Sequence, residues 1–141
     1  MPVKSVTLVK EDGRRTDLAL VDVTNKAALA SCWRTWIAPG NAAWHTSVDG
    51  CALIGATATA TAGYSWTVDW NSLGAACLKG RGYYYQSYPG GGSWYQIYRA
   101  IGCGSSGTSG GGSVLWGNVA SVKKVQMLAT SSPIGAAGMF Q

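Results

Sequence analysis

The sequence has few of the residues that build catalytic sites. Its 141 residues include one histidine and six acidic side chains, four of which come before residue 23. The only His–Asp pair close in sequence is His45 with Asp49, and no G-x-S-x-G motif supplies a nucleophile for a triad. A glycosidase needs two carboxylates across a cleft, and only Asp49 and Asp69 lie beyond the N-terminal region. We therefore predict no catalytic residues and a protein that is not an enzyme.

Motifs for cofactors, membrane insertion and export are also missing. The single histidine, the lack of an acidic cluster and the lack of a C-x-x-C pair predict no metal site and no cofactor. No apolar run is long enough to span a membrane. The start of the chain, Met1 to Lys4, lacks the apolar core of a signal peptide. This predicts that a leader has been removed, or that the protein leaves the cell without one, as phage structural proteins do at lysis.

Charge is scarce as well. Charged residues make up 12% of the chain, about half the typical share, and the formal net charge is +5. The basic residues are scattered, with Arg14-Arg15 and Lys123-Lys124 as the longest runs. Nucleic acids attract clustered Lys and Arg, so we expect no nucleic-acid partner.

The four cysteines predict disulfides. An even number of cysteines in a glycine-rich, charge-poor chain is typical of an oxidising environment. Three pairings are possible, and the alternative is four free thiols in a reducing cell. We favour Cys32–Cys51 and Cys77–Cys103, because each closes a local loop.

The composition divides the chain into a charged arm and an aromatic body. Residues 1–31 hold nine of the seventeen charged side chains, no aromatic residue and no cysteine. Alternating apolar residues on both sides of Asp12-Gly13 predict a β-hairpin in this arm, followed by a short helix over 25–31. The hairpin strands, within residues 3–23, could add to the sheet edge of a partner. The body would be residues 32–141.

Glycine and aromatic residues in the body favour short strands and tight turns. The side chains of Tyr64, Trp66, Val68 and Trp70 recur at every second position, which predicts a half-buried strand with both tryptophans on one face. The other expected strands cover 33–37, 43–46, 51–61, 77–88, 94–101, 114–116 and 119–128. The Gly/Ser-rich stretches 89–93 and 104–113 are expected to be a wide turn and a flexible loop, and Met139-Phe140 to dock on the body or on a neighbouring chain. We predict an all-β, disulfide-braced β-sandwich or barrel with an N-terminal hairpin arm.

The aromatic residues are the main functional indication. Trp and Tyr rings stack on sugars and anchor protein interfaces, and arginines beside them can contact anionic groups or the rings. The alternative is that the rings fill a core poor in Phe, Ile and Leu. The predicted binding residues are Trp66, Asp69, Trp70, Arg81, Tyr84, Tyr88, Trp94 and Arg99.

About half of the chain resembles small secreted proteins of high-GC Gram-positive bacteria. The residues that carry the likeness are 63–68 (GYSWTV), 77–83 (CLKGRGY), 102–104 (GCG) and 114–119 (VLWGNV). Such proteins mostly have no assigned activity, so the resemblance implies export and a β fold but no mechanism. They carry a leader, which is not seen here.

Taken together, these patterns predict a non-enzymatic extracellular binding or adaptor module that acts through protein–protein contacts. The alternatives are a virion structural or receptor-binding protein, a lectin-like binder of cell-surface glycans and a secreted antibacterial toxin. The expected partner is a protein or a glycan, and the chain could form a homo-oligomer or join a larger assembly. The expected location is outside the cell or on a virion surface.

Overall fold

The described part of the chain consists of strands and loops. The computed structural model describes residues 6–9, 15–18 and 32–141, and the helix expected over 25–31 lies outside them. None of the described residues forms a helix that could cross a membrane. The strands are β1 (Val6–Val9), β2 (Arg15–Leu18), β3 (Arg34–Ala38), β4 (His45–Thr46), β5 (Ala52–Ile54), β6 (Thr61–Val68), β7 (Ala76–Tyr88), β8 (Gly91–Gly104), β9 (Ser109–Leu115), β10 (Ala120–Val122), β11 (Val125–Ala129) and β12 (Ala136–Phe140).

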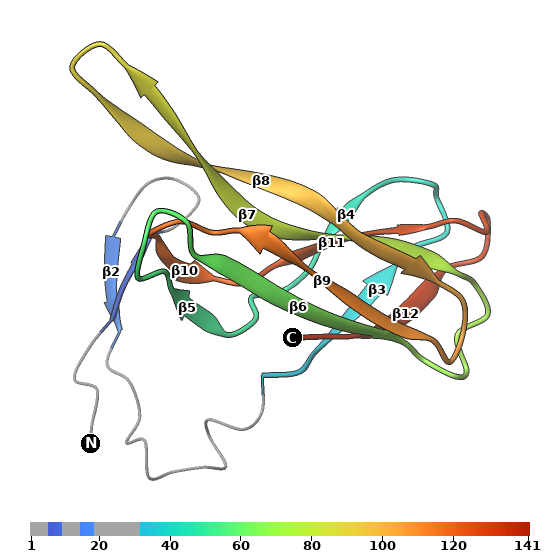
Figure 1. The fold of residues 1–141 in the computed structure, drawn as a ribbon. Helices are drawn as coiled ribbons and strands as arrows, with labels where there is room; N and C mark the ends of the chain where they lie inside the picture. Colours follow the sequence, from blue (N-terminus) through green and yellow to red (C-terminus); the bar gives the residue numbers. More distant parts are fainter. Residues whose placement is uncertain (1–5, 10–14, 19–31) are drawn as a thin grey trace, which may run out of the picture.

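Two four-stranded antiparallel sheets form the body (Figure 1). One has the strand order β4-β11-β7-β8 and the other β3-β12-β6-β9, and buried side chains from both contribute to one apolar core. A two-stranded β5–β10 sheet lies beside them, and β1 pairs antiparallel with β2. The predicted all-β fold is confirmed. The turn expected at Asp12-Gly13 lies outside the described residues, and the division of the chain at residue 31 stays a prediction.

The alternation along β6 places its side chains as the sequence predicts, but only as far as Val68. Tyr64, Trp66 and Val68 are buried, while Trp70 lies beyond the end of the strand with 84% of its surface exposed. The chain turns after Val68, where the backbone carbonyl of Asp69 accepts a hydrogen bond from the backbone N–H of Ser72. The prediction that Trp66 and Trp70 share one face is therefore wrong.

The glycine-rich stretch 104–113 is not the loop that its composition predicts. Residues from Ser109 onward form β9, which pairs with β6. The glycines are needed there for a steric reason: a Cβ atom at Gly110 would lie 2.5 Å from the Trp66 ring, and one at Gly104 would lie 2.9 Å from it. The missing side chains make room for a buried indole, a use of glycine where close approach is needed.

Several other boundaries also differ from the prediction. Tyr88 pairs with Gly91, so only two residues form the turn at the start of the stretch 89–93. The prediction of a wide turn over 89–93 is therefore wrong. Proline fixes φ at the first turn position, and Gly90 adopts φ of +87° at the second. The long strands expected over 51–61 and 119–128 are each interrupted. The tail does dock on its own body, where β12 lies between β3 and β6 and Phe140 is fully buried.

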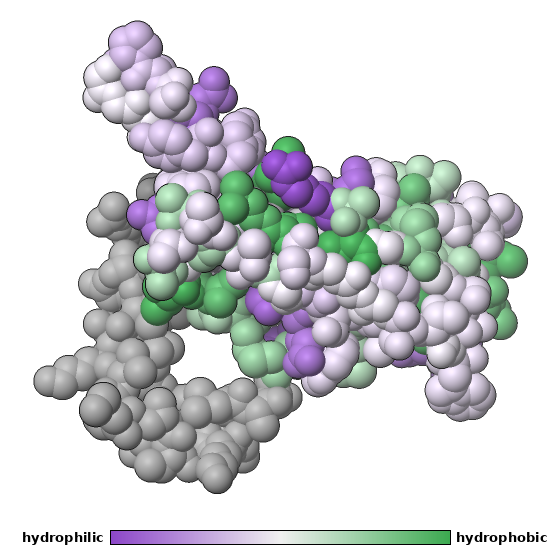
Figure 2. Space-filling view, viewed as in Figure 1, coloured by the Kyte–Doolittle hydropathy of each residue, from purple (hydrophilic) through white to green (hydrophobic). Residues whose placement is uncertain are grey.

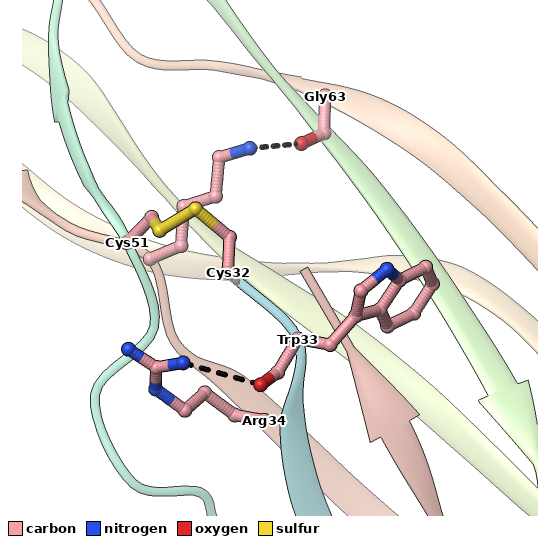
Figure 3. The surroundings of a disulfide bond; sticks show 6 residues. Cys32, Trp33, Arg34, Cys51 and Gly63 are labelled. Atoms are coloured by element: carbon pink, nitrogen blue, oxygen red, sulfur yellow. Dashed lines mark hydrogen bonds between the residues drawn. A yellow bond between two sulfur atoms is a disulfide. The ribbon is translucent and has the colours of Figure 1, made fainter. Parts of the chain in front are cut away.

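Two disulfides brace the body, with the favoured pairings confirmed. Cys32–Cys51 joins the chain before β3 to the chain before β5 (Figure 3). Near it, the Lys123 ammonium donates a hydrogen bond to the Gly63 carbonyl at 2.6 Å. Cys77–Cys103 joins two directly opposed residues of β7 and β8. Two disulfides are compatible with an extracellular protein.

A buried tyrosine links the two large sheets and gives a pH prediction. The Tyr64 hydroxyl donates to the Arg81 carbonyl at 2.6 Å, and burial raises the pKa of Tyr64 well above its ordinary value of 10.0. The folded state therefore holds this proton more tightly than the unfolded chain. The resulting stability is fully present below pH 10 and is lost as the pH rises further. Ultraviolet titration should show one tyrosine ionising after the exposed ones, and Tyr64→Phe should remove that late step. If the late step persists in Tyr64→Phe, another tyrosine carries it.

Candidate functional site

A long hairpin projects from one end of the sandwich (Figure 1). Strands β7 and β8 remain paired up to Tyr88 and Gly91, whereas the ladder between β11 and β7 begins at Gly80. The outer part of the hairpin, residues 82–97, is called the tip here. It is a two-stranded ribbon that continues past the four-stranded sheet.

Cross-strand ring pairs stiffen the tip. Tyr84 lies opposite Tyr95 with ring centroids 5.9 Å apart, and Tyr85 lies opposite Trp94 at 5.3 Å with the rings nearly perpendicular. Successive residues of a strand point to opposite faces, so each face of the ribbon carries one pair. Such aromatic pairs are a main source of stability in antiparallel strands.

Three of the tip tyrosines reach solvent. The exposed fractions are 52% for Tyr85, 49% for Tyr88 and 44% for Tyr95. The hydroxyl of Tyr88 lies 3.3 Å from that of Ser93, and the neighbouring Tyr88 phenol raises the pKa of Tyr95. The tip therefore offers apolar ring surface with hydroxyl groups at its margin.

A shallow groove runs beside the tip where it leaves the body. Its volume is about 540 Å³, and it is lined by Tyr84, Tyr85, Trp94, Leu115, Ala58 and Asn118. The Trp94 ring packs against Gly117, where an added Cβ atom would lie 2.4 Å from the ring. Gly117 has a φ of +73°, which also favours glycine. Half-buried Trp94 thus belongs partly to the core and partly to this surface.

The predicted binding residue Arg81 is buried, with 2% of its surface exposed. Its guanidinium donates hydrogen bonds to the Val122 carbonyl at 2.5 Å, to the Ser121 hydroxyl at 3.3 Å and to the Gln96 side chain at 3.4 Å. A buried charge must be paired in this way, so Arg81 fixes the base of the hairpin to β10. As placed here, it cannot reach a surface ligand.

A neighbouring tyrosine strengthens the same anchor. The Tyr83 hydroxyl donates to Ser121 at 2.8 Å, and its ring meets the buried Trp116 ring edge-on at 5.0 Å. Tyr83 at the base of the tip therefore belongs to the core, and only the part of the tip beyond it is available for contacts.

The other predicted binding residues divide into two groups. Tyr84, Tyr88 and Trp94 come together on the hairpin, and Arg99 is exposed on β8 opposite Gly80. The residues 66, 69 and 70 are not part of this surface: Trp66 is 3% exposed, Asp69 is half-buried, and Trp70 lies in the β6–β7 loop at the other end of the sandwich. Tyr85 and Tyr95 lie on the same hairpin and are not among the residues predicted from the sequence. A two-residue turn at Pro89-Gly90 would have placed Tyr85 opposite Trp94 and Tyr84 opposite Tyr95.

His45 and Asp49, the residues considered for catalysis, each contact a different side chain and not each other. His45 contacts the Asn41 side chain at 2.9 Å through Nε2, and Asp49 forms an ion pair with Lys124 at 3.3 Å. Among residues 32–141 and the described parts of β1 and β2, no group of three or more His, Cys, Asp or Glu could hold a metal ion.

The fold and the surface define an all-β, disulfide-braced protein with a projecting aromatic hairpin. Comparisons of the chain with protein-family models, with curated proteins and with solved structures found no match. Its function must therefore be inferred from its own residues.

Proposed function

We propose that this chain is a non-enzymatic extracellular binding or adaptor module whose tip contacts a protein partner. The observation that carries the proposal is the exposure of Tyr85, Tyr88 and Tyr95 on a projecting hairpin with a rigid base. Tyrosine is enriched among residues that dominate binding energy at protein interfaces, and rings already held in place lose little entropy on binding. The two disulfides support a location outside the cell.

The chemistry of the tip favours a protein over a glycan. A ligand site for a small polar molecule needs convergent polar groups that fix its orientation. The chain from residue 70 to its end contains no Asp or Glu, and the charged Arg81 is turned inward. Tyrosine hydroxyls and backbone groups fit the mixed apolar and polar character of a protein surface better.

Replacing Tyr88 or Tyr85 with alanine should weaken partner binding by at least about 2 kcal/mol, or roughly 30-fold in Kd. The partner is first identified with a photo-crosslinking amino acid at position 88, added to extracellular proteins and intact cells of the source organism. Mass spectrometry of the adduct names the protein, and calorimetry with that protein measures the Kd of each variant.

The matched control carries the crosslinker, or the alanine, at position 70. Trp70 is the more exposed ring but lies at the opposite end of the body. A protein adduct from position 70 and none from position 88 would contradict the proposal. Binding to a glycan array that Tyr88→Ala abolishes would replace the protein partner with a sugar.

A further inference from the structure

The outer edge of β8 is open along the tip. Among the described residues, β8 pairs only with β7 and forms one edge of its sheet. Strand β9 lies beside the inner part of β8, where the Trp66 indole also donates to the Ile101 carbonyl. The part from Gly91 to Ile97 continues past the end of the four-stranded sheet (Figure 1).

The backbone geometry shows which groups point outward along this edge. The backbone N–H of Arg81 donates to the Lys124 carbonyl on the β11 side. The backbone N–H and C=O groups of Arg81 therefore face away from β8. Its opposite residue Tyr98 therefore points its own N–H and C=O away from β7, and every second residue of β8 does the same. In the tip these residues are Gly92, Trp94 and Gln96.

This edge carries none of the features that protect edge strands. Residues 91–97 (GGSWYQI) contain no charge and no proline, and the register shift between the two strands lies further in, next to Leu78 and Lys79. Figure 2 shows the tip mostly in pale colours, with little strongly hydrophilic surface. Natural proteins guard open edges with lysine, proline or bulges. A two-stranded ribbon is also marginally stable until a further strand joins it.

We propose that the β8 edge of the tip pairs with the β8 edge of a second copy of this chain. The two strands run antiparallel around a twofold axis at Tyr95, so that Tyr95 of the two copies meet. The Gln96 N–H of one copy then donates to the Trp94 carbonyl of the other. The result is a four-stranded sheet built from two tips. The β7 side differs at its base, because β7 is an inner strand that pairs with β11 up to Gly80, and the Arg81 N–H donates to the Lys124 carbonyl.

The charges along the strand favour a second copy as the occupant. Arg99 is the only charged residue of β8, and the twofold axis places it opposite Gly91 of the other copy. The two arginines are thus kept far apart, and no like charges meet. A different protein would gain no charge complementarity from residues 91–97, whereas an isologous pairing needs only a surface that fits itself.

This pairing goes beyond the proposed function, because it uses the strand edge and leaves Tyr85 and Tyr88 exposed. One dimer would present two sets of these rings side by side. Linking two binding surfaces raises the effective affinity for a repetitive or dimeric target, although each surface makes the same contacts as before.

The test compares Gln96→Pro with Gln96→Ala in sedimentation equilibrium of the purified protein. Both variants lose the side-chain contact with Arg81, but only proline removes the outward N–H. Proline is tolerated at an edge position that faces solvent, so the β7–β8 ladder should survive, as circular dichroism would show. We expect wild type and Gln96→Ala at twice the 14.7 kDa chain mass and Gln96→Pro at the mass of one chain.

Tyr95→Lys provides a second variant if Gln96→Pro fails to fold. It places two ammonium groups at the axis and should also give monomers. A wild type that stays monomeric up to millimolar concentration overturns the inference, as does a dimer that persists in both Gln96→Pro and Tyr95→Lys. Neither result tests the proposed function. That function is tested separately, by crosslinking to a different protein and by the Kd for that protein. A monomer crosslinked from position 96 to a foreign strand would instead assign the edge to that protein.

Discussion

Replacing Trp66 with alanine is expected to destabilise the protein by about 3–5 kcal/mol, the usual cost of removing a large buried aromatic side chain. The indole is 3% exposed, and its Nε1 donates to the Ile101 carbonyl at 2.9 Å, between the two large sheets. Gly102, Gly104 and Gly110 surround the ring and have no side chains that could fill the space. The cavity would therefore collapse poorly, which places the cost at the upper end of the range.

Trp70→Ala is the matched control for Trp66→Ala. It removes the same side chain four residues later, where the ring is 84% exposed, and should change stability by no more than about 0.5 kcal/mol. Urea unfolding of both variants measures the difference. A Trp66→Ala variant with wild-type stability but no partner binding would show that Trp66 is the binding residue the sequence predicted.

Removing both disulfides is expected to unfold most of the protein near room temperature. The bridges close loops of 19 and 26 residues, for which loop entropy gives about 3 kcal/mol each. Together they contribute about 6 kcal/mol, which reaches the lower end of the stability of a typical domain, about 5–15 kcal/mol. We expect the thermal transition to disappear or to fall sharply in reducing agent.

Serine pairs separate the two bridges. Cys32→Ser with Cys51→Ser and Cys77→Ser with Cys103→Ser should each retain a cooperative transition at a lower Tm, and the quadruple variant should lose it. Calorimetry in the absence of reductant provides this comparison. If reduction leaves the Tm unchanged, the bridges do not brace the fold, and the disulfide support for an extracellular location is lost.

The fold class and the disulfide pairing could be predicted because their signals are local. Alternation from Tyr64 to Val68 marks a strand with one buried face, and each cysteine pair closes a short loop. The aromatic strand predicted over 77–88 agrees with β7 to within one residue. These features depend on residues close to one another in the sequence.

The parts that were missed depend on contacts between distant residues. Position 110 pairs with Trp66 of β6 and must be glycine because the Trp66 ring occupies the space of a Cβ atom. Arg81 is buried because Ser121 and Val122, forty residues later, accept its hydrogen bonds. Composition assigns such residues to a loop and to the surface, and only the tertiary fold overrides that assignment.

The Cys77–Cys103 bridge has a mechanical consequence for the tip. It ties β7 to β8 at the body end of the same two strands whose far ends form the projecting ribbon. The turn at Pro89-Gly90 joins the same two strands at their outer end. The ribbon is therefore closed covalently at both ends, and a pull on the turn loads β7 and β8 together instead of separating them. The bridge keeps the two strands in register where they enter the sandwich.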